Sequence, residues 1–227
     1  MFWIPPRKRN QYDPVFANNT WAEIIKACQN KEVPETWTVG SQKAMTINGT
    51  AYVIDIIGKG HDDYSDGSGK APLTFQMHDC YGTQYAMNSS ETNMGGWRNC
   101  AMRTNHLPAI LALMPSEVQN GIREVDKLTS VGSKNSTITT TADKLFLLSE
   151  IEIFGSVKYS KSGEGTQYDY YKAGNSKVKN RDGSADRWWE RSPKGSNFNS
   201  FCRVTSSGFA NDENANFASS VAFGFCF

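Results

Sequence analysis

Two short polar clusters contain the residue types that metal binding or nucleophilic catalysis requires. The first, His61-Asp62-Asp63-Tyr64-Ser65-Asp66-Gly67, offers several oxygen ligands and one imidazole. It departs from the calcium-loop pattern, because Tyr64 stands where a third carboxylate or an Asn belongs. Asp and Gly also favour turns for backbone reasons of their own. The segment therefore predicts a turn rather than a metal site, and we expect no metal and no cofactor.

The second cluster is His78-Asp79-Cys80, which has the residue types of an acid–base or nucleophilic site. Successive side chains of a strand point to opposite faces, so His78 and Cys80 share a side that Asp79 does not. A catalytic constellation needs side chains that converge on one point. The sequence therefore predicts no catalytic residue here.

The cysteines raise the question of disulfides or metal binding. There are five, an odd number, and no CxxC pair or Cys/His spacing typical of zinc sites occurs. Buried free thiols are the favoured interpretation, because free Cys behaves as a small hydrophobic residue. A disulfide between Cys202 and Cys226, or between Cys80 and Cys100, stays open.

Composition excludes several classes of protein. The chain has 227 residues, enough to bury a substantial core, and its 38% hydrophobic and 21% charged residues are typical of neither a disordered nor a membrane protein. The net charge of +1 argues against general attraction to nucleic acid or anionic lipid. No stretch approaches the roughly 20 apolar residues that span a bilayer. The N-terminal sequence MFWIPPRKRNQYDP lacks the pattern of an ordinary signal peptide.

In the N-terminal half, local signals predict an arm, a helix and a hairpin. Residues 1–15 are expected to form an extended arm that is disordered or docks onto a neighbouring subunit. A capping box of Thr20 and Glu23 predicts a helix over about 20–31. Asn48-Gly49 lies between alternating apolar segments and predicts a β-hairpin.

The rest of the chain predicts a mixture of helices, strands and loops. LPAILALMP is expected to be helical up to Pro115, and a second helix, capped by Ser116 and Gln119, is expected over SEVQNGIREVDKL. The sequence LFLLSEIEIFG predicts a buried strand, residues 157–186 a long surface loop, and the terminal segment two or three short strands. We expect one α+β domain over residues 16–227, with short strands, two to three helices and long surface loops.

The last 41 residues, from Arg187 to Phe227, combine two kinds of composition. Trp188-Trp189 opens this segment and the apolar run VAFGFCF closes it, whereas the middle is rich in Asn, Ser and Gly. Composition alone is compatible with core aromatics that flank an ordinary solvated loop. Lone phenylalanines among Asn and Ser are instead typical of a ligand-binding surface.

From about residue 20 the chain resembles a family of phage and gut-bacterial proteins, most specifically at WWERSP and VAFGFCF. The C-terminal part resembles the C-type-lectin-like fold, and within that fold it is similar to the variable proteins of diversity-generating retroelements. In those relatives a reverse transcriptase misreads template adenines and rewrites the 3′ end of the variable gene, usually at Asn codons. The resemblance implies a C-type-lectin-like domain with a diversified ligand-binding region at about 185–220.

The resemblance also implies which residues vary and which hold the fold. Residue types reachable from a randomised Asn codon dominate the middle segment, whereas Lys194 and Glu213 are not reachable and are left out. The residues that hold the fold are expected to be Trp188, Trp189, Phe223 and Phe225. The residues expected to form the ligand-binding face are Asp186, Arg187, Asn197, Phe198, Asn199, Ser200, Arg203, Phe209, Asn211, Asp212, Asn214 and Asn216.

The resulting functional hypothesis is a non-catalytic protein that recognises a host cell-surface protein or glycan. It would be displayed on a phage tail or bacterial surface, as an oligomer that is a trimer by analogy. The alternative is a structural phage or cell-envelope protein, which would contact virion or envelope proteins through its N-terminal arm. An oxidoreductase similar to formylglycine-generating enzymes is disfavoured, because Cys202 and Cys226 are 24 residues apart and those enzymes have a close pair. The motifs of calcium-dependent lectins, EPN or QPD with WND, are missing as well.

Overall fold

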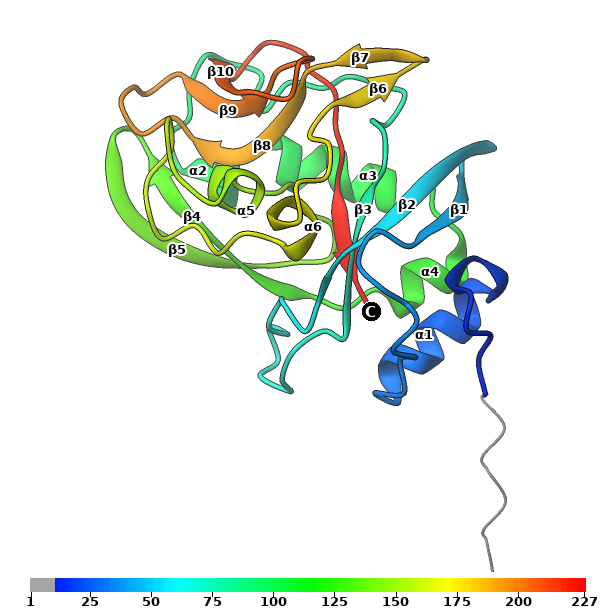
Figure 1. Cartoon of the computed structure of the whole chain (residues 1–227). Helices are drawn as coiled ribbons and strands as arrows, with labels where there is room; N and C mark the ends of the chain where they lie inside the picture. The colour runs from blue at the N-terminus through cyan, green and yellow to red at the C-terminus, as the bar shows by residue number, and fades with distance from the viewer. Residues whose placement is uncertain (1–10) are drawn as a thin grey trace, which may run out of the picture.

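The chain folds into a mixed α+β structure with several small sheets and short helices (Figure 1). A computed structural model describes residues 11–227. The α-helices in this range are α1 (Trp21–Gln29), α2 (Gly96–Asn99), α3 (Leu107–Leu111), α4 (Ser116–Gly121), α5 (Glu150–Phe154) and α6 (Asp169–Lys172). A 3₁₀ turn, η1 (Phe16–Asn18), precedes α1, and a π-helical turn, η2 (Met102–His106), leads into α3.

The strands form four antiparallel sheets within residues 11–227. The first sheet has the order β1-β2-β3-β11 and the second has the order β10-β9-β8, while β4-β5 and β6-β7 are two-stranded. The strands are β1 (Gln42–Ile47), β2 (Thr50–Lys59), β3 (Leu73–Met77), β4 (Val125–Gly132), β5 (Asn135–Asp143), β6 (Lys179–Arg181), β7 (Ser184–Asp186), β8 (Trp188–Pro193), β9 (Ser200–Val204), β10 (Ala210–Asn214) and β11 (Gly224–Cys226).

The C-terminal apolar run closes the first sheet. Strand β11 pairs with β3, so that Phe225 lies opposite Phe75, and their rings stack with centroids 5.2 Å apart. Trp21 of α1 meets both rings, and Phe227 is fully buried beside them. In Figure 1, β11 runs through the middle of the molecule, between β8–β10 at one end and α1 at the other. The core therefore joins the two ends of the chain.

The two strongest local signals are confirmed. Thr20 accepts a hydrogen bond from the Glu23 backbone N–H, and the Glu23 side chain accepts one from the Thr20 backbone, so the capping box starts α1. Asn48 and Gly49 join β1 to β2 with φ angles of +47° and +80°. These left-handed conformations are what a tight two-residue hairpin turn requires.

The predicted helix over SEVQNGIREVDKL is wrong in its second half. Helix α4 ends at Gly121, and Val125 already begins β4, whose buried residues alternate as in a strand. A Cβ added at Gly121 would lie 2.6 Å from Ile25 Cδ1, so the close approach of α1 requires glycine there. The Ser116 side chain does not cap the helix, because Pro115 occupies the N-cap position.

Three further expectations about secondary structure need correction. Leu145–Leu148 is buried, but only Phe146 pairs there, in an isolated bridge with Gly224, and Ser149 and Glu152 form a capping box that starts α5, so LFLLSEIEIFG is not a strand. The region 157–186 is not merely a surface loop, because it contains α6, the β6-β7 hairpin and three buried tyrosines, Tyr168, Tyr170 and Tyr171. The structure also has six short α-helices within residues 11–227 where two to three were expected.

The predicted N-terminal arm falls partly outside the described residues. Residues 1–10, which make up most of the arm predicted over residues 1–15, lie outside them. Tyr12 is buried and its ring centroid lies 5.9 Å from that of Trp37. The folded domain therefore includes residues before the predicted boundary at 16.

Candidate functional site

The region expected to bind a ligand folds as the sheet β8–β9–β10 with the β6-β7 hairpin at its edge, drawn in yellow to red in Figure 1. The sheet lies at one end of the molecule, over the long β4-β5 hairpin. Strand β8 is buried along its whole length, β9 is buried except at Arg203, and β10 is half-buried. We call the buried strand residues the core side of this sheet, and β10 with the loops that join and follow the strands its outward side.

The aromatic residues that flank the segment belong to the core, with Trp188 and Trp189 in β8 and Phe225 in β11 of the first sheet. Trp188, Trp189, Phe223 and Phe225 are each fully buried. The indole N–H of Trp188 donates to the carbonyl of Lys177 at 3.0 Å, and that of Trp189 donates to the carbonyl of Tyr85 at 2.8 Å. Both tryptophans therefore bury their rings without leaving a polar group unpaired.

A buried ionic network lies beneath the same strands. Arg191 of β8 forms two hydrogen bonds with the Glu152 carboxylate, at 2.5 and 2.8 Å, and further bonds with backbone carbonyls. Lys127 of β4 binds Asp62 and Tyr168. The charge of Arg191 and that of Lys127 hold the pKa of Glu152 below its usual range despite its burial. This pairing fixes β8 against β4 and α5.

The pairing of β8 with β9 contains an irregularity that buries one more carboxyl group. Trp189 pairs with Arg203 and Pro193 with Phe201, so three residues of β8 lie opposite Cys202 alone. One of the three, Glu190, is fully buried, and neither carboxyl oxygen has a hydrogen-bond partner within residues 11–227. Burial, and then the neighbouring Glu150 and Glu164, raise the pKa of Glu190 well above its usual range. A buried carboxyl group whose protonated form is favoured therefore lies within β8.

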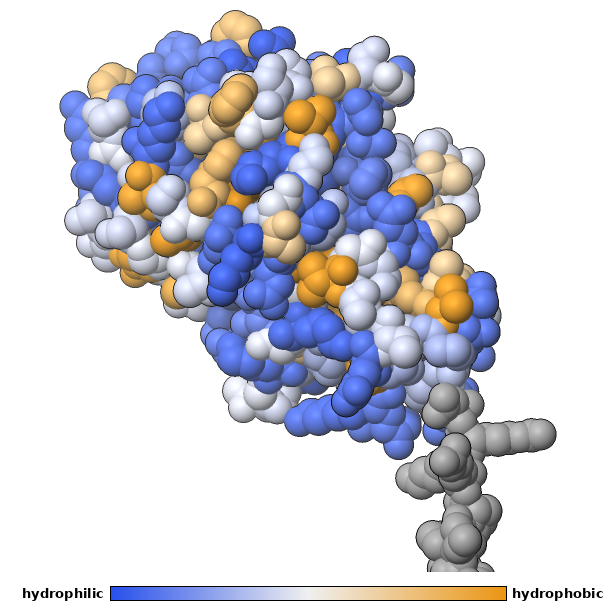
Figure 2. Space-filling model, in the orientation of Figure 1, coloured by the Kyte–Doolittle hydropathy of each residue, from blue (hydrophilic) through white to orange (hydrophobic). Residues whose placement is uncertain are grey.

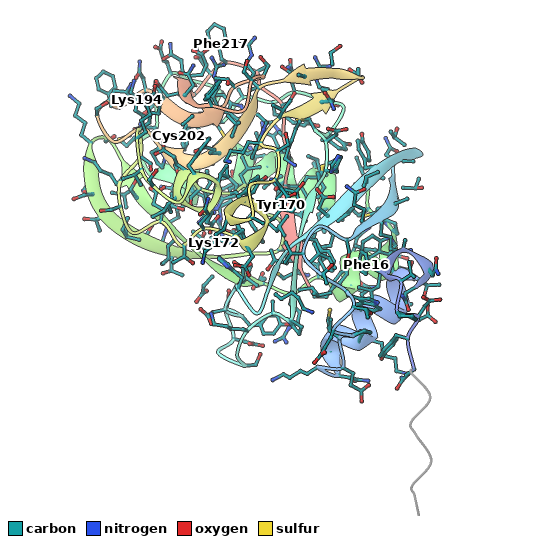
Figure 3. All side chains as sticks on the ribbon, viewed as in Figure 1. Phe16, Tyr170, Lys172, Lys194, Cys202 and Phe217 are labelled. Atoms are coloured by element: carbon teal, nitrogen blue, oxygen red, sulfur yellow. The ribbon has the colours of Figure 1, made fainter. Side chains whose placement is uncertain are left out.

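Three phenylalanines in the loops of the outward side are exposed. Phe198 between β8 and β9, Phe209 between β9 and β10, and Phe217 after β10 have 61%, 70% and 54% of their surface exposed, although Phe is usually buried. Arg187, just before β8, and Asn216, just after β10, are exposed as well. Phe217 lies at the outer limit of the molecule, beyond β10 (Figure 3). In Figure 2 the apolar groups at this end are separated by hydrophilic surface, so they do not merge into one continuous apolar patch.

Most of the polar residues expected on the face make bonds within the segment. Arg203 pairs with Glu213 at 3.1 Å and Asp212 with Lys194 at 2.9 Å. The two residues excluded from the variable set therefore hold two members of that set in place. The other bonds within the segment are Asn197 to Ser200, Asn211 to the Asp212 backbone, and Asn214 to Ser200, whereas Asn199 donates to Glu91 outside it.

Ser200 does not belong to the exposed face. It is 2% exposed, and its hydroxyl bonds with Asn197, Asn199 and Asn214. Its backbone carbonyl also accepts a hydrogen bond from Asn93 at 2.8 Å. The segment folds back on itself at this point, so Ser200 organises the face from inside. Sequence alone did not distinguish this serine from the exposed ones beside it.

Phe217 was not among the predicted residues, although it is more than half exposed. The signal that would have identified it is the one used for Phe198 and Phe209, a lone phenylalanine between small and polar residues. The chain reverses direction at Asn214, whose carbonyl accepts a hydrogen bond from the Phe217 N–H, and this turn places the ring outside.

A hollow of about 300 Å³ opens at the edge of the face, where β7 meets β8 and the end of β9. Its charged residues are Asp186, Arg187 and Arg203. The Asp186 carboxylate is held by Arg181 at 2.9 Å, Gln84 at 2.9 Å and Ser220 at 2.8 Å. Ala185, Thr205 and Ser206 complete the lining.

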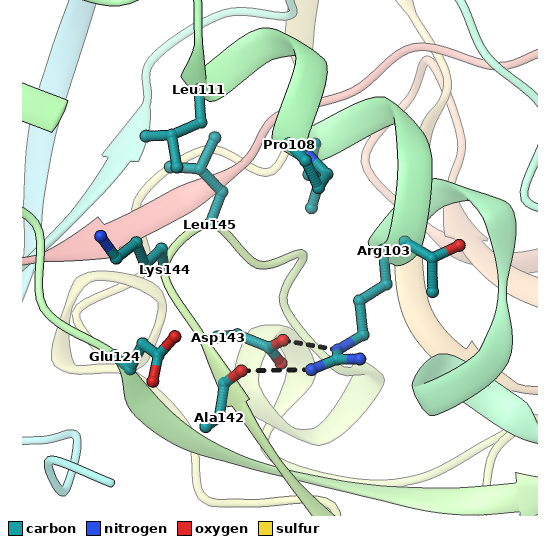
Figure 4. A pocket seen from close by; sticks show the side chains of 10 residues that line it. Arg103, Pro108, Leu111, Glu124, Ala142, Asp143, Lys144 and Leu145 are labelled. Carbon is teal, nitrogen blue, oxygen red and sulfur yellow. Dashed lines mark hydrogen bonds and ion pairs between the residues drawn. The ribbon is translucent and has the colours of Figure 1, made fainter. Parts of the chain in front are cut away.

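A second hollow, of about 370 Å³, lies away from this face between η2, α3 and the end of β5 (Figure 4). Its charged residues include Arg103 and Asp143, which pair with each other at 2.6 Å. Trp97 and Thr141 also donate to the Asp143 carboxylate, at 2.8 and 2.6 Å. The carboxylate is therefore saturated by the fold itself, which favours a structural role.

The two polar clusters singled out from the sequence have structural partners. Asp62, Asp63 and Asp66 pair with three different cations, Lys127, Lys70 and Arg123 respectively, so their carboxylates diverge. His78 Nδ1 lies 2.9 Å from Asp55, and that hydrogen bond raises the pKa of His78. Burial raises the pKa of Cys80 to about 12, which suppresses the thiolate form that a nucleophile needs.

All five cysteines are buried and have free thiols, as the sequence favoured. Burial raises the pKa of Cys202 and of Cys226 well above the usual value. Within residues 11–227 no helix has the length and apolar character needed to cross a membrane.

Comparison with known proteins gives one match. No curated protein and no solved structure matches the chain. Residues 72–222 match the family described as a domain of unknown function, DUF6273. The matched segment begins just before β3 and includes β8–β10 with all three exposed phenylalanines. It covers about two thirds of the sequence, and the chain therefore belongs to the DUF6273 family.

Proposed function

We propose that this protein is a C-type-lectin-like binding protein that catalyses no reaction. Its ligand is a host cell-surface protein or glycan, bound by the outward side of β8–β10. The observation that carries the proposal is the exposure of Phe198, Phe209 and Phe217 in the loops of a sheet whose strand β8 holds the fully buried Trp188 and Trp189. Exposed aromatic groups on a rigid support are typical of binding surfaces, because they bury a large area while losing little side-chain entropy.

The same division of residues supports a diversified face, as in variable proteins of diversity-generating retroelements. Substitution of Arg187, Phe198, Phe209, Asn216 or Phe217 would change the exposed surface and leave the core intact. A single polar and adaptable face binds with modest affinity, and an oligomer, a trimer by analogy, displayed on a phage tail or bacterial surface would add avidity.

A triple variant tests the proposal, with Phe198, Phe209 and Phe217 each changed to Ser. Binding of the purified, fluorescently labelled protein to intact candidate host cells is measured by flow cytometry. We expect the triple variant to lose binding while its thermal unfolding temperature changes little. A matched triple variant of exposed apolar residues elsewhere, Val53, Leu113 and Leu128 to Ser, serves as the control. Equal binding by both variants would contradict the proposal.

Sequencing of the gene's 3′ end in its native population tests diversification separately. We expect substitutions to concentrate at adenines of Asn-type codons between Ala185 and Ser220, next to a near-copy template and a reverse-transcriptase gene. Variation spread evenly along the gene would favour the alternative, a structural phage or envelope protein that acts through residues 1–15.

A further inference from the structure

The hollow at the edge of the face has an excess of positive charge. Asp186 is paired with Arg181, and Arg203 is paired with Glu213, so these four charges balance. Arg187 is exposed, and within residues 11–227 its side chain makes no hydrogen bond or ion pair. One guanidinium is therefore left over in a hollow that two guanidinium groups line.

The second guanidinium also has unused hydrogen-bond donors. Arg203 bonds Glu213 through Nη1, while its Nε is buried and has no partner among the described residues. Burial lowers the pKa of Arg203, and the charge of Arg187 lowers it further, which agrees with two cations held close together. An anion placed in the hollow would bond with the exposed Arg187 guanidinium and relieve this repulsion.

The rest of the hollow has the features of a sugar site. Thr205 and Ser206 contribute hydroxyl groups to the lining. Phe209 closes the turn against Thr205, with its N–H donating to Thr205 Oγ1 at 3.0 Å and its carbonyl accepting from the Thr205 N–H at 2.8 Å. Phe209 does not line the hollow itself, but it is bonded to Thr205, which does, and its ring is 70% exposed and free to meet the apolar side of a bound sugar ring. The volume of about 300 Å³ is at the small end of the range for ligand sites.

We propose that this hollow binds the carboxylate of an acidic sugar, through Arg187 and Arg203, with Phe209 against the ring. The inference rests on the proposed function, because it names the ligand class for part of the same face. It adds to that function a requirement for negative charge on the glycan.

Protein-observed NMR titrations test the inference with small probes. The probes are D-glucuronate and N-acetylneuraminate, with D-glucose, acetate, sulfate and a tetra-aspartate peptide as comparisons. We expect both acidic sugars to shift resonances of Arg187, Arg203 and Phe209, with weaker binding at higher salt. Binding of D-glucose, acetate, sulfate or the peptide as tight as that of the acidic sugars would overturn the inference.

Variants of the full chain then assign the effect to the hollow. Arg187→Gln removes one charge from the exposed surface and is expected to raise the Kd for the acidic sugars about tenfold or more. Phe209→Ser is expected to raise it about three- to tenfold. The control is Lys172→Gln, which removes an exposed charge from α6 and is expected to leave the Kd unchanged. An equal effect of Arg187→Gln and Lys172→Gln would overturn the inference.

Cell binding measured in parallel separates this inference from the proposed function. Loss of cell binding in the phenylalanine variant, together with no acidic-sugar binding, would overturn the inference and leave the proposed function standing. Acidic-sugar binding that depends on Arg187, with no binding to any host cell, would support the sugar site in the hollow. It would count against the proposal that the protein recognises a host cell surface.

Discussion

The two sides of the sheet β8–β9–β10 are stabilised by different kinds of interaction. The core side contains Trp188, Trp189 and Arg191, which are all fully buried. Trp189 bonds with Tyr85 and Arg191 with Glu152, in other elements of the fold. The outward side is held by pairs within the C-terminal segment itself, such as Lys194–Asp212 and Arg203–Glu213. A change on the core side therefore disturbs several elements, whereas a change of an exposed side chain on the outward side disturbs one pair at most. This difference allows a binding surface to vary without loss of the fold.

The largest expected effect comes from the buried ionic network. Arg191→Met would leave the Glu152 carboxylate buried without its main partner, which costs about 3–5 kcal/mol of unfolding free energy. The matched change on the outward side, Arg187→Met, is expected to cost less than about 0.5 kcal/mol. Urea denaturation of both variants measures the difference. Similar losses in both would mean that the two sides are not distinct.

The second prediction concerns the pH dependence caused by Glu190. Its pKa in the folded protein is far above the ordinary value of 4.5, so the folded state holds this proton to higher pH than the unfolded state does. The stability that Glu190 contributes is complete below pH 4.5 and is lost as pH rises toward the folded pKa, by about 1.4 kcal/mol per pH unit. Glu190→Gln should therefore stabilise the protein increasingly above pH 4.5.

Thermal unfolding of the two proteins from acid to neutral pH tests this prediction. Burial also raises the pKa of Glu164, so the Glu190→Gln variant is expected to keep part of the dependence. Parallel stability curves for the variant and the wild type would show that Glu190 is already ionised in the folded protein.

A smaller effect is expected from the ion pair between Lys194 and Asp212. Both side chains are partly exposed, at 23% and 16%, so solvent weakens their attraction. A double-mutant cycle with Lys194→Met and Asp212→Asn should give a coupling energy of about 0.2–1 kcal/mol. Several kcal/mol of coupling would indicate that this pair belongs to the structural core.

The smallest effect on stability is expected at Phe217. Its ring is 54% exposed, so Phe217→Ser should change the unfolding free energy by about 0.5 kcal/mol or less. Calorimetry measures this change, and Phe201→Ser on the buried side of β9 provides the contrast. Comparable losses of stability for both would place the Phe217 ring in the core.

Short sequence motifs predicted the elements that depend on interactions between residues close together in the sequence. The Thr20–Glu23 capping box and the Asn48-Gly49 turn depend on bonds within a few residues, and both are confirmed. The burial of Trp188 and Trp189 was also predicted, because large aromatic side chains are on average highly buried in folded proteins.

The features that the sequence did not predict depend on distant partners. Helix α4 ends early because Val125 enters a ladder with Asp143, a residue that no local pattern links to it. The tyrosines of region 157–186 are buried by contacts such as that between Tyr168 and Asp62, 106 positions away. Ser200 is buried because the segment folds onto Asn93. The sequence predicted which types of residue the face would contain, but not the hydrogen bonds and ion pairs that these residues form.

A deep mutational scan of residues 186–219 tests the central claim most directly. Each variant is displayed on yeast and scored twice, for resistance to protease as a measure of folding and for binding to host cells. The account predicts that substitutions at Trp188, Trp189 and Arg191 abolish both signals, whereas those at Phe198, Phe209 and Phe217 abolish binding alone. If substitutions of the three phenylalanines lower both signals together, or neither, the separation of binding face from core would be contradicted.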